Sequence, residues 1–316
     1  METFRFGGTI VEDTYAEAFD GLYCRLLITG ERGLTEEDTN SPFPQYDPLR
    51  IAALRLEATP SIVVGRIEAG IEKWLSKDQT PDGREGVLVQ CWGVYDKKKS
   101  FEEQAEKFKK ELSIRLKQDV LSASGGTTRV FGKKPKKTVY RMDTEERVGK
   151  CGGGYETFLE NSKTINVPLM SGYDFKIDNN IECNIGISGG NFWLMCDSVE
   201  AGRRAGKASI EAIKKVDDVV TPFYICPSGS METFYGPSTN YRYCPSLRNL
   251  PDSKVPIGVN SIMEIVINGE DLKAVKNAMR EGILASTNLD GVKIISAGNY
   301  EGKLGQYKIY LRELLL

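Results

Sequence analysis

A strand–helix–strand pattern that occurs twice in each half of the chain restricts the possible folds more than any other feature of the sequence. In the second half, apolar residues at three- and four-residue steps predict one helix from Ala201 to Val216 and another from Leu272 to Ile283. Apolar runs typical of strands flank each helix. The strands predicted in this half are 190–198, 219–226, 261–269, 291–299 and 305–311.

The first half repeats the same order of elements. Asp47 and Pro48 indicate the start of a helix that runs to Leu56, because Asp caps helices and Pro is tolerated in the first turn. A second helix is predicted from the apolar positions between Phe101 and Val120. The strands predicted in this half are 23–30, 61–67 and 86–95, and the polar stretch 30–48 is predicted to be a surface insertion.

Two strand–helix–strand units in succession build a ferredoxin-like α/β sandwich, in which two helices cover one side of an antiparallel sheet. Two such pairs predict an α+β protein with two ferredoxin-like lobes, that is, a duplicated split β-α-β unit. A length of 316 residues suits two cores of roughly 150 residues each. The stretch 131–156, rich in Lys, Arg, Glu and Gly, is predicted to be a solvated loop or hairpin, which gives lobes 1–147 and 148–316.

Charge and hydropathy exclude several classes of partner. The 42 Lys and Arg nearly balance the 44 Asp and Glu, so the formal charge of −2 gives no overall attraction to nucleic acid or to anionic lipid. No apolar run reaches the roughly 20 residues that cross a bilayer, and the first residues lack the pattern of a signal peptide. We therefore expect a cytoplasmic protein that binds neither nucleic acid nor membrane.

The absence of histidine excludes many catalytic mechanisms. With 0 His, a Ser-His-Asp or Cys-His apparatus and a His-ligated metal are impossible. The 7 cysteines are dispersed and show no C-x-x-C spacing, so we expect reduced thiols. The chemistry must therefore use carboxylates, amides, hydroxyls, Lys, Arg or backbone groups.

Glu264 is the candidate catalytic residue, because it interrupts the apolar strand 261–269. Both faces of this strand are apolar, and a carboxylate removed from water is costly unless it is paired or protonated. Two interpretations stay open: a residue at the solvated rim of the sheet, or a desolvated carboxyl with a raised pKa. In the second case a neutral carboxyl could act as a general acid in a protein without histidine.

Two further stretches are candidates for ligand binding. Residues 222–247 combine Ser, Thr, Asn, Tyr and Gly, which suits either an irregular connection or a site for a polar heterocycle. The glycines before strand 190–198 indicate either a bulge or backbone N–H groups that bind an oxygen. The candidate binding residues in these stretches are Ser238, Thr239, Asn240, Gly189, Gly190 and Asn191.

Seven stretches together resemble the formylmethanofuran:tetrahydromethanopterin formyltransferase family. They follow the family's order from end to end, and the last is highly specific. The stretches are EDTYAEAF (12–19), IEAGIE (67–72), TPDGREGV (80–87), SGGNFWLM (188–195), STNYRYCP (238–245), MEIVING (263–269) and KIISAGNYEGKLGQYKIYL (293–311).

The resemblance implies two ferredoxin-like lobes and a cytoplasmic enzyme of one-carbon metabolism, usually a homotetramer with the site near a subunit interface. It implies no metal and no tightly bound cofactor. The reaction moves a formyl group from the amine of formylmethanofuran to N5 of tetrahydromethanopterin. The family's active-site glutamate lies in the strand that matches 263–269, which places it on Glu264.

The chemistry of this reaction suits a neutral carboxyl. Attack by N5 gives a tetrahedral intermediate with an oxyanion, and the departing amine must gain a proton, so a carboxyl that holds its proton can serve both groups. Both coenzymes carry carboxylates and the pterin also carries a phosphate, so we expect Lys or Arg at the rim of the cleft.

The chain departs from the family pattern at 114–126 and 223–238. Two alternatives therefore stay open: a paralogue with altered specificity or without activity, and a subunit of a formyltransferase/hydrolase complex.

Overall fold

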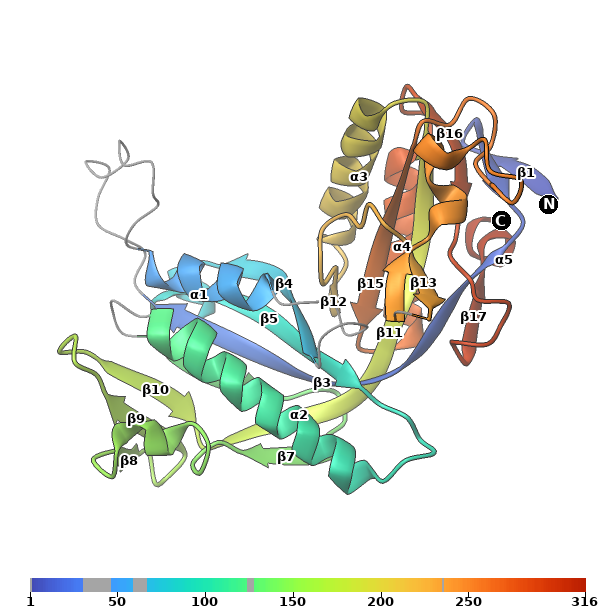
Figure 1. Ribbon diagram of the computed structural model, residues 1–316. Coiled ribbons are helices and arrows are strands. Elements are labelled where there is room, and N and C mark those ends of the chain that lie inside the picture. Colours follow the sequence, from blue (N-terminus) through green and yellow to red (C-terminus); the bar gives the residue numbers. More distant parts are fainter. Residues whose placement is uncertain (1, 31–46, 59–66, 124–127, 235) are drawn as a thin grey trace. The chain divides into compact units, whose positions relative to one another are not determined.

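The computed structural model describes residues 2–30, 47–58, 67–123, 128–234 and 236–316. These residues form two compact units (Figure 1). Unit 1 comprises Met1–Asp20 and Gly186–Leu316, and unit 2 comprises Gly21–Ile185. The long strands β3 (Tyr15–Gly30) and β11 (Asn180–Cys196) each contribute residues to both units.

The central sheet of unit 1 has the strand order of a ferredoxin-like fold. The order is β16–β11–β15–β12, and all neighbours are antiparallel. Along the chain, β11 leads to α3, then β12, β15, α4 and β16, which is the split β-α-β arrangement predicted from the periodicity. The bounds of the elements not yet given are β12 Val219–Val220, β15 Ser261–Gly269, β16 Val292–Ser296, α3 Val199–Ile213 and α4 Leu272–Ser286.

Helices α3 and α4 both start at side-chain caps. Ser198 accepts the Ala201 N–H at 3.3 Å, and Asp271 accepts the Ala274 N–H at 2.8 Å. The two helices pack on each other and on β15, and their apolar residues bury Phe192 and Ile265 on one face of the sheet. The site described below lies on the opposite face of this sheet.

That opposite face of the sheet is covered by a long irregular segment. It contains the hairpin of β13 (Ser230–Thr233) and β14 (Gly236–Thr239) and the 3₁₀ turns Tyr241–Tyr243 and Pro245–Leu247. Trp193, Met195 and Val259 form a small buried cluster beneath it.

Residues from the two ends of the chain complete unit 1. The hairpin of β1 (Thr3–Phe6) and β2 (Thr9–Glu12) adds to β16, with β2 and β16 parallel. Near the other end, β17 (Tyr307–Tyr310) pairs with the first residues of β3, and the short helix α5 (Leu311–Leu315) follows.

Unit 2 repeats the arrangement. Its central order is β6–β3–β5–β4, again antiparallel throughout, and α1 and α2 join the strands in the split β-α-β sequence. The two-lobed α+β fold expected from the sequence is therefore confirmed. The bounds are α1 Pro48–Glu57, β4 Ile67–Leu75, β5 Glu85–Val94, α2 Phe101–Arg115 and β6 Arg129–Lys133.

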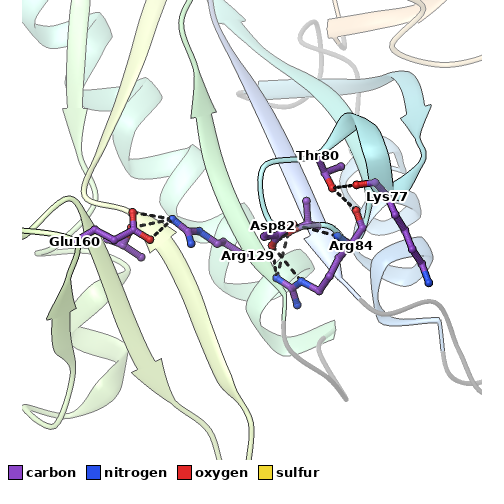
Figure 2. Close-up of polar contacts among 8 residues, drawn as sticks. Lys77, Thr80, Asp82, Arg84, Arg129 and Glu160 are labelled. Carbon is purple, nitrogen blue, oxygen red and sulfur yellow. Dashed lines mark hydrogen bonds and ion pairs between the residues drawn. The ribbon is translucent and has the colours of Figure 1, made fainter.

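Polar contacts hold two turns of unit 2 (Figure 2). TPDGREGV (80–87) covers the turn before β5 and the first residues of that strand, and in the turn Arg84 donates to Asp82 at 2.8 and 3.1 Å. Thr80 donates to the Lys77 carbonyl at 3.1 Å. Arg129 of β6 pairs with Glu160 at 3.0 Å, next to an additional meander of β8 (Thr157–Leu159), β9 (Thr164–Pro168) and β10 (Asp174–Asp178). The start of the TPDGREGV stretch thus forms a turn that its own polar contacts stabilise.

Several element bounds differ from the prediction. The strand predicted at 219–226 is only Val219–Val220 with an isolated bridge at Cys226, because Pro222 interrupts the pairing. The predicted strand 305–311 ends at Tyr310, where α5 begins. The stretch 131–156, predicted to be a loop or hairpin, contains the end of β6 and all of β7 (Tyr140–Asp143), which pairs with β11 and not within the stretch. Residues 61–66 of the strand predicted at 61–67, and 31–46 of the insertion predicted at 30–48, lie outside the described residues.

The compact units do not coincide with the predicted lobes 1–147 and 148–316. Residues 148–185 pack with unit 2, because β9 and β10 extend its sheet from β6. Residues before Gly21 pack with unit 1, because β1, β2 and the start of β3 pair there. That residues 1–147 and 148–316 fold as independent parts stays a prediction.

Candidate functional site

Glu264 lies on the face of the unit 1 sheet opposite to α3 and α4. Its register partner on β11 is Trp193. On its other side Cys226 forms an isolated bridge, with the two backbone N–H groups donating to the opposite carbonyls at 2.8 Å each. Strand pairing therefore fixes the Glu264 side chain between an indole and a thiol.

The surroundings of Glu264 favour the protonated carboxyl. Burial raises the pKa of Glu264, and hydrogen bonds from Trp193 and Cys226 oppose this shift only in part. The Trp193 Nε1–H donates to Oε1 of Glu264 at 3.1 Å. No ion pair involves Glu264 among the residues that the structure describes. The half-buried position of Glu264 and the direction of its pKa shift favour the desolvated carboxyl over a residue at the solvated rim, while its catalytic role stays a prediction.

Glu264 opens into a small cavity of about 170 Å³, which we call the acid pocket. Its walls carry hydroxyl and thiol groups, which offer hydrogen bonds without net charge. The pocket is large enough for a small acyl group, but not for a whole coenzyme. The other lining residues are Trp193, Cys226, Pro227, Ser228, Gly229, Asn240, Tyr243, Cys244, Pro245, Ser246 and Ile262.

A second cavity of about 470 Å³, the large pocket, shares the residues Trp193, Asn240 and Tyr243 with the acid pocket. The rings of Trp193 and Tyr243 meet edge to face, with centroids 4.6 Å apart and an interplanar angle of 77°. Aromatic walls of this kind suit a flat heterocycle. The other lining residues are Thr14, Ser230, Met231, Arg242, Lys254, Ser296, Ala297, Asn299, Tyr300, Glu301, Lys303 and Leu304.

Tyr300 lines the large pocket, and the charge of Glu264 in the acid pocket affects its pKa. Its hydroxyl donates to the Ser230 carbonyl at 3.1 Å. Burial, followed by the negative charge of Glu264, raises the pKa of Tyr300 to about 12. The phenol therefore stays protonated at neutral pH.

The loop from Tyr300 to Gly305, here called the anchor loop, is held by one buried carboxylate. Oε1 of Glu17 accepts the N–H groups of Tyr300 and Gly302 at 2.6 Å each. Oε2 accepts those of Leu304 and Gly305 at 2.8 Å each. Burial alone would raise the pKa of Glu17, but these four hydrogen bonds together lower it. Glu17 thus fixes one wall of the large pocket.

The predicted binding residues Gly189, Gly190 and Asn191 make contacts within the protein. The Gly189 N–H donates to Asn268 at 3.0 Å, and Gly189 sits at a φ of +88° in an irregularity of β11. Gly190 faces α4, where a Cβ would lie 2.3 Å from Val275. Asn191 holds the end of β16, because it accepts the Gly298 N–H at 2.6 Å and donates to the Gly298 carbonyl at 3.1 Å. Contact of these residues with a substrate stays a prediction.

The other three predicted binding residues follow β14 toward the cavities. Ser238 is exposed on the hairpin, and Thr239 donates to the Ser228 carbonyl at 3.0 Å. Asn240 lines both cavities and is the one member of the six that the structure brings to Glu264. Its backbone N–H is held by the carbonyls of Ser228 and Gly229 at 2.9 and 3.0 Å.

Trp193, Tyr300 and Glu17 were missed by sequence reasoning. Trp193 had a usable signal, because it lies two positions after Asn191 and therefore on the same face of the strand. Tyr300 and Glu17 lie in stretches that carry the family resemblance, but no periodicity or neighbouring residue pointed to their roles. Their partners lie far away along the chain, so only the folded structure brings them together.

The described residues contain neither a metal-binding cluster nor a membrane-spanning helix. No cluster of three or more Cys, Asp or Glu in the described ranges is arranged to hold a metal ion. No helix in the same ranges is long and apolar enough to cross a bilayer.

Family comparisons match almost the whole chain. The family described as "Formylmethanofuran-tetrahydromethanopterin formyltransferase" matches residues 4–169, and "FTR, proximal lobe" matches residues 173–314. Two relatives come from Archaeoglobus fulgidus. One, named a "formylmethanofuran--tetrahydromethanopterin formyltransferase-like protein", is 45% identical over 98% of this chain and 97% of its own length. The other, named without "-like", is 39% identical over 98% of this chain and 99% of its own length.

Two solved structures share the fold. The formylmethanofuran:tetrahydromethanopterin formyltransferase from Methanosarcina barkeri is 35% identical with a TM-score of 0.82, covering 98% of this chain and 100% of that one. The formyltransferase/hydrolase complex from Methylorubrum extorquens, in complex with methylofuran, contains a chain 27% identical with a TM-score of 0.82, covering 100% and 99%. The protein is thus a member of the formylmethanofuran–tetrahydromethanopterin formyltransferase family.

Proposed function

We propose that this protein transfers a formyl group between formylmethanofuran and N5 of tetrahydromethanopterin, with Glu264 as its general acid. The observation that carries this proposal is the placement of Glu264. A carboxyl with a raised pKa opens into a small cavity that shares a wall of Trp193 and Tyr243 with a larger aromatic one. Membership in the family supports the choice of substrates.

In the proposed mechanism N5 attacks the formyl carbon while the carbonyl oxygen points to the protonated Glu264. A C–N bond forms, and the hydrogen bond from Glu264 stabilises the oxyanion of the tetrahedral intermediate. As the bond to the methanofuran amine breaks, Glu264 gives its proton to that nitrogen. The proton lost by N5 returns to the carboxylate, so that the acid is restored and charges balance.

The proposed mechanism uses only residues that are present in this chain. Asn240 borders both cavities and is proposed to orient the formyl group, and Ser238, Thr239, Gly189, Gly190 and Asn191 are proposed to support substrate binding around it. No metal or tightly bound cofactor enters the mechanism. We propose that the enzyme acts in the cytoplasm as a homotetramer.

Assaying purified protein for formyl transfer between the two coenzymes tests the proposal. The Glu264→Gln variant should lose about 10²- to 10⁴-fold in kcat, which is the range for a general acid. It should still bind both coenzymes, because the amide keeps the shape of the side chain. Glu281→Gln on the exposed surface of α4 is the control and should keep wild-type rates.

Two results would reject parts of the proposal. A folded wild-type protein without turnover would reject the activity. Turnover that Glu264→Gln leaves intact would reject the role of Glu264 while sparing the activity.

A second candidate function is a paralogue with altered specificity or without catalysis. The specific observation is that Archaeoglobus fulgidus holds both kinds of relative, and this chain is more similar to the "-like" protein. Tight binding of a coenzyme without turnover, measured by calorimetry, would favour this candidate. Co-purification with hydrolase chains would instead indicate a complex like that from Methylorubrum extorquens.

A further inference from the structure

Three cationic side chains, Arg242, Lys254 and Lys303, stand at the mouth of the large pocket, and we call them the cationic rim. They come from separate segments that the fold holds in place. The Lys254 N–H donates to the Arg242 carbonyl at 2.7 Å, which joins two of the segments. Lys303 belongs to the anchor loop, whose backbone Glu17 fixes. The backbone segments that carry the three cations are therefore held by hydrogen bonds.

The rim has more positive than negative charge. Arg242 pairs with Asp252 at 3.1 Å, and Lys303 pairs with Glu301 at 2.6 Å. No carboxylate of the described residues lies within ion-pair distance of Lys254, which is exposed. Three cations thus face two carboxylates at the entrance of an aromatic cavity.

Glu301 pairs with Lys303 and also interacts electrostatically with the other two cations. The pKa of Glu301 is lowered chiefly by Lys303, and further by Lys254 and Arg242, so its carboxylate lies in the field of all three. Its side chain is 79% exposed, and its backbone has a φ of +59°, which few residues other than glycine adopt. An exposed ion pair of this kind contributes little to stability. The carboxylate of Glu301 is therefore easy to displace.

We propose that the cationic rim is a subsite for an anionic group of the ligand, a carboxylate or a phosphate, and that this group replaces the carboxylate of Glu301. The proposal rests on the proposed function for the identity of the ligand, because both coenzymes carry such groups. The aromatic walls would hold the flat part of the ligand while the rim holds its charged tail. Charge-assisted hydrogen bonds to Lys and Arg are about twice as strong as neutral ones, so the rim would contribute to affinity and orientation.

The two substitutions that test the subsite should act in opposite directions. Lys254→Met removes a cation that pairs with no carboxylate of the described residues, and it should weaken binding of the anionic ligand by about 5- to 10-fold. Glu301→Gln removes the competing carboxylate and should tighten binding by about 2- to 5-fold. If the cationic rim only stabilised the fold, neither substitution would increase the affinity for the anionic ligand.

A matched ion pair on α3 supplies the controls. Lys207 and Glu211 lie 3.7 Å apart and are 76% and 62% exposed, on a helix that covers the other face of the sheet. Lys207→Met and Glu211→Gln therefore change charge by the same amounts without touching the rim. Both should bind like the wild-type protein.

The experiment is calorimetric titration of wild type and the four variants with methanofuran and, separately, with tetrahydromethanopterin. The expected result is the opposite pair of shifts for one coenzyme, which identifies whose tail the rim holds. A parallel titration with inorganic phosphate, followed by the fluorescence of Trp193 against a Trp193→Phe blank, tests the rim without either coenzyme.

The outcomes separate this proposal from the proposed function. Equal affinities in all five proteins, for both coenzymes and for phosphate, overturn the subsite even if formyl transfer proceeds. Opposite shifts for phosphate without coenzyme binding or formyl transfer support the subsite and reject the proposed function.

Discussion

Removing the charge of Glu17 tests how the large pocket is built. In the variant Glu17→Gln one carboxylate oxygen becomes an NH₂ group, which faces two backbone N–H donors of the anchor loop instead of accepting them. Two of the four hydrogen bonds are lost, and the other two become bonds to a neutral acceptor. We expect the anchor loop to detach from the start of β3.

The magnitude follows from the hydrogen bonds. A hydrogen bond to a charged group contributes about 1.5–3 kcal/mol, so losing two costs about 3–6 kcal/mol. Relief from burying a charge offsets part of this cost, which leaves about 3 kcal/mol. For a domain of 150–250 residues this corresponds to a fall in Tm of about 6–12 °C.

Thermal unfolding and amide hydrogen exchange measure the effect. We expect faster exchange at Tyr300, Gly302, Leu304 and Gly305, together with a lower Tm. If the loop opens locally, exchange rises while Tm changes less, because local opening limits the cost to the whole unit. Glu301→Gln, an exposed carboxylate on the same loop, is the control and should change the free energy of unfolding by less than about 0.5 kcal/mol.

The direction of the pKa shift of Glu17 fixes how its contribution to stability changes with pH. Because the pKa of Glu17 is lower in the folded protein than its ordinary value of 4.5, its stabilising contribution is complete above that pH and is lost as the pH falls through the lowered pKa. The difference in stability between wild type and Glu17→Gln should therefore stay constant near neutral pH and shrink on acidification. The reasoning is refuted if the variant keeps both its wild-type Tm and the protection of these amides.

Three further predictions concern the sheet around Glu264. Since the pKa of Glu264 is raised, kcat should fall as the pH rises through that pKa, and a flat profile well above neutral pH would contradict the acid role. Trp193→Phe removes a donor that favours the ionised carboxyl, so this fall should move to higher pH, whereas Trp74→Phe on unit 2 should leave the profile in place. Gly190→Ala should lower stability by about 1–3 kcal/mol in denaturant unfolding, because its Cβ would clash with Val275. Adding Val275→Ala should recover part of that loss, and two independent, additive losses would show that the two residues do not compete for the same space.

The family resemblance and the periodicity agree on the fold for a physical reason. Helical stripes such as Leu272 to Ile283, and apolar runs such as 261–269, report burial through spacings of two, three and four residues, which depend on local geometry alone. The same spacings do not predict short strands. β8 to β10 have three to five residues each, too few for a period to stand out. Their pairing decides that they are strands: β10 pairs with β6, β9 with β10, and β8 with β9.

By itself the sequence determined the two ferredoxin-like sandwiches and singled out Glu264, because a charged residue inside an apolar strand breaks a local pattern. Only the tertiary structure decided what surrounds that carboxyl. Trp193 and Cys226 reach it through strand pairing, and Glu17 meets the anchor loop 283 to 288 positions away along the chain. Contacts at such separations leave no periodic trace, because they depend on how the completed elements pack and not on the spacing of neighbouring residues.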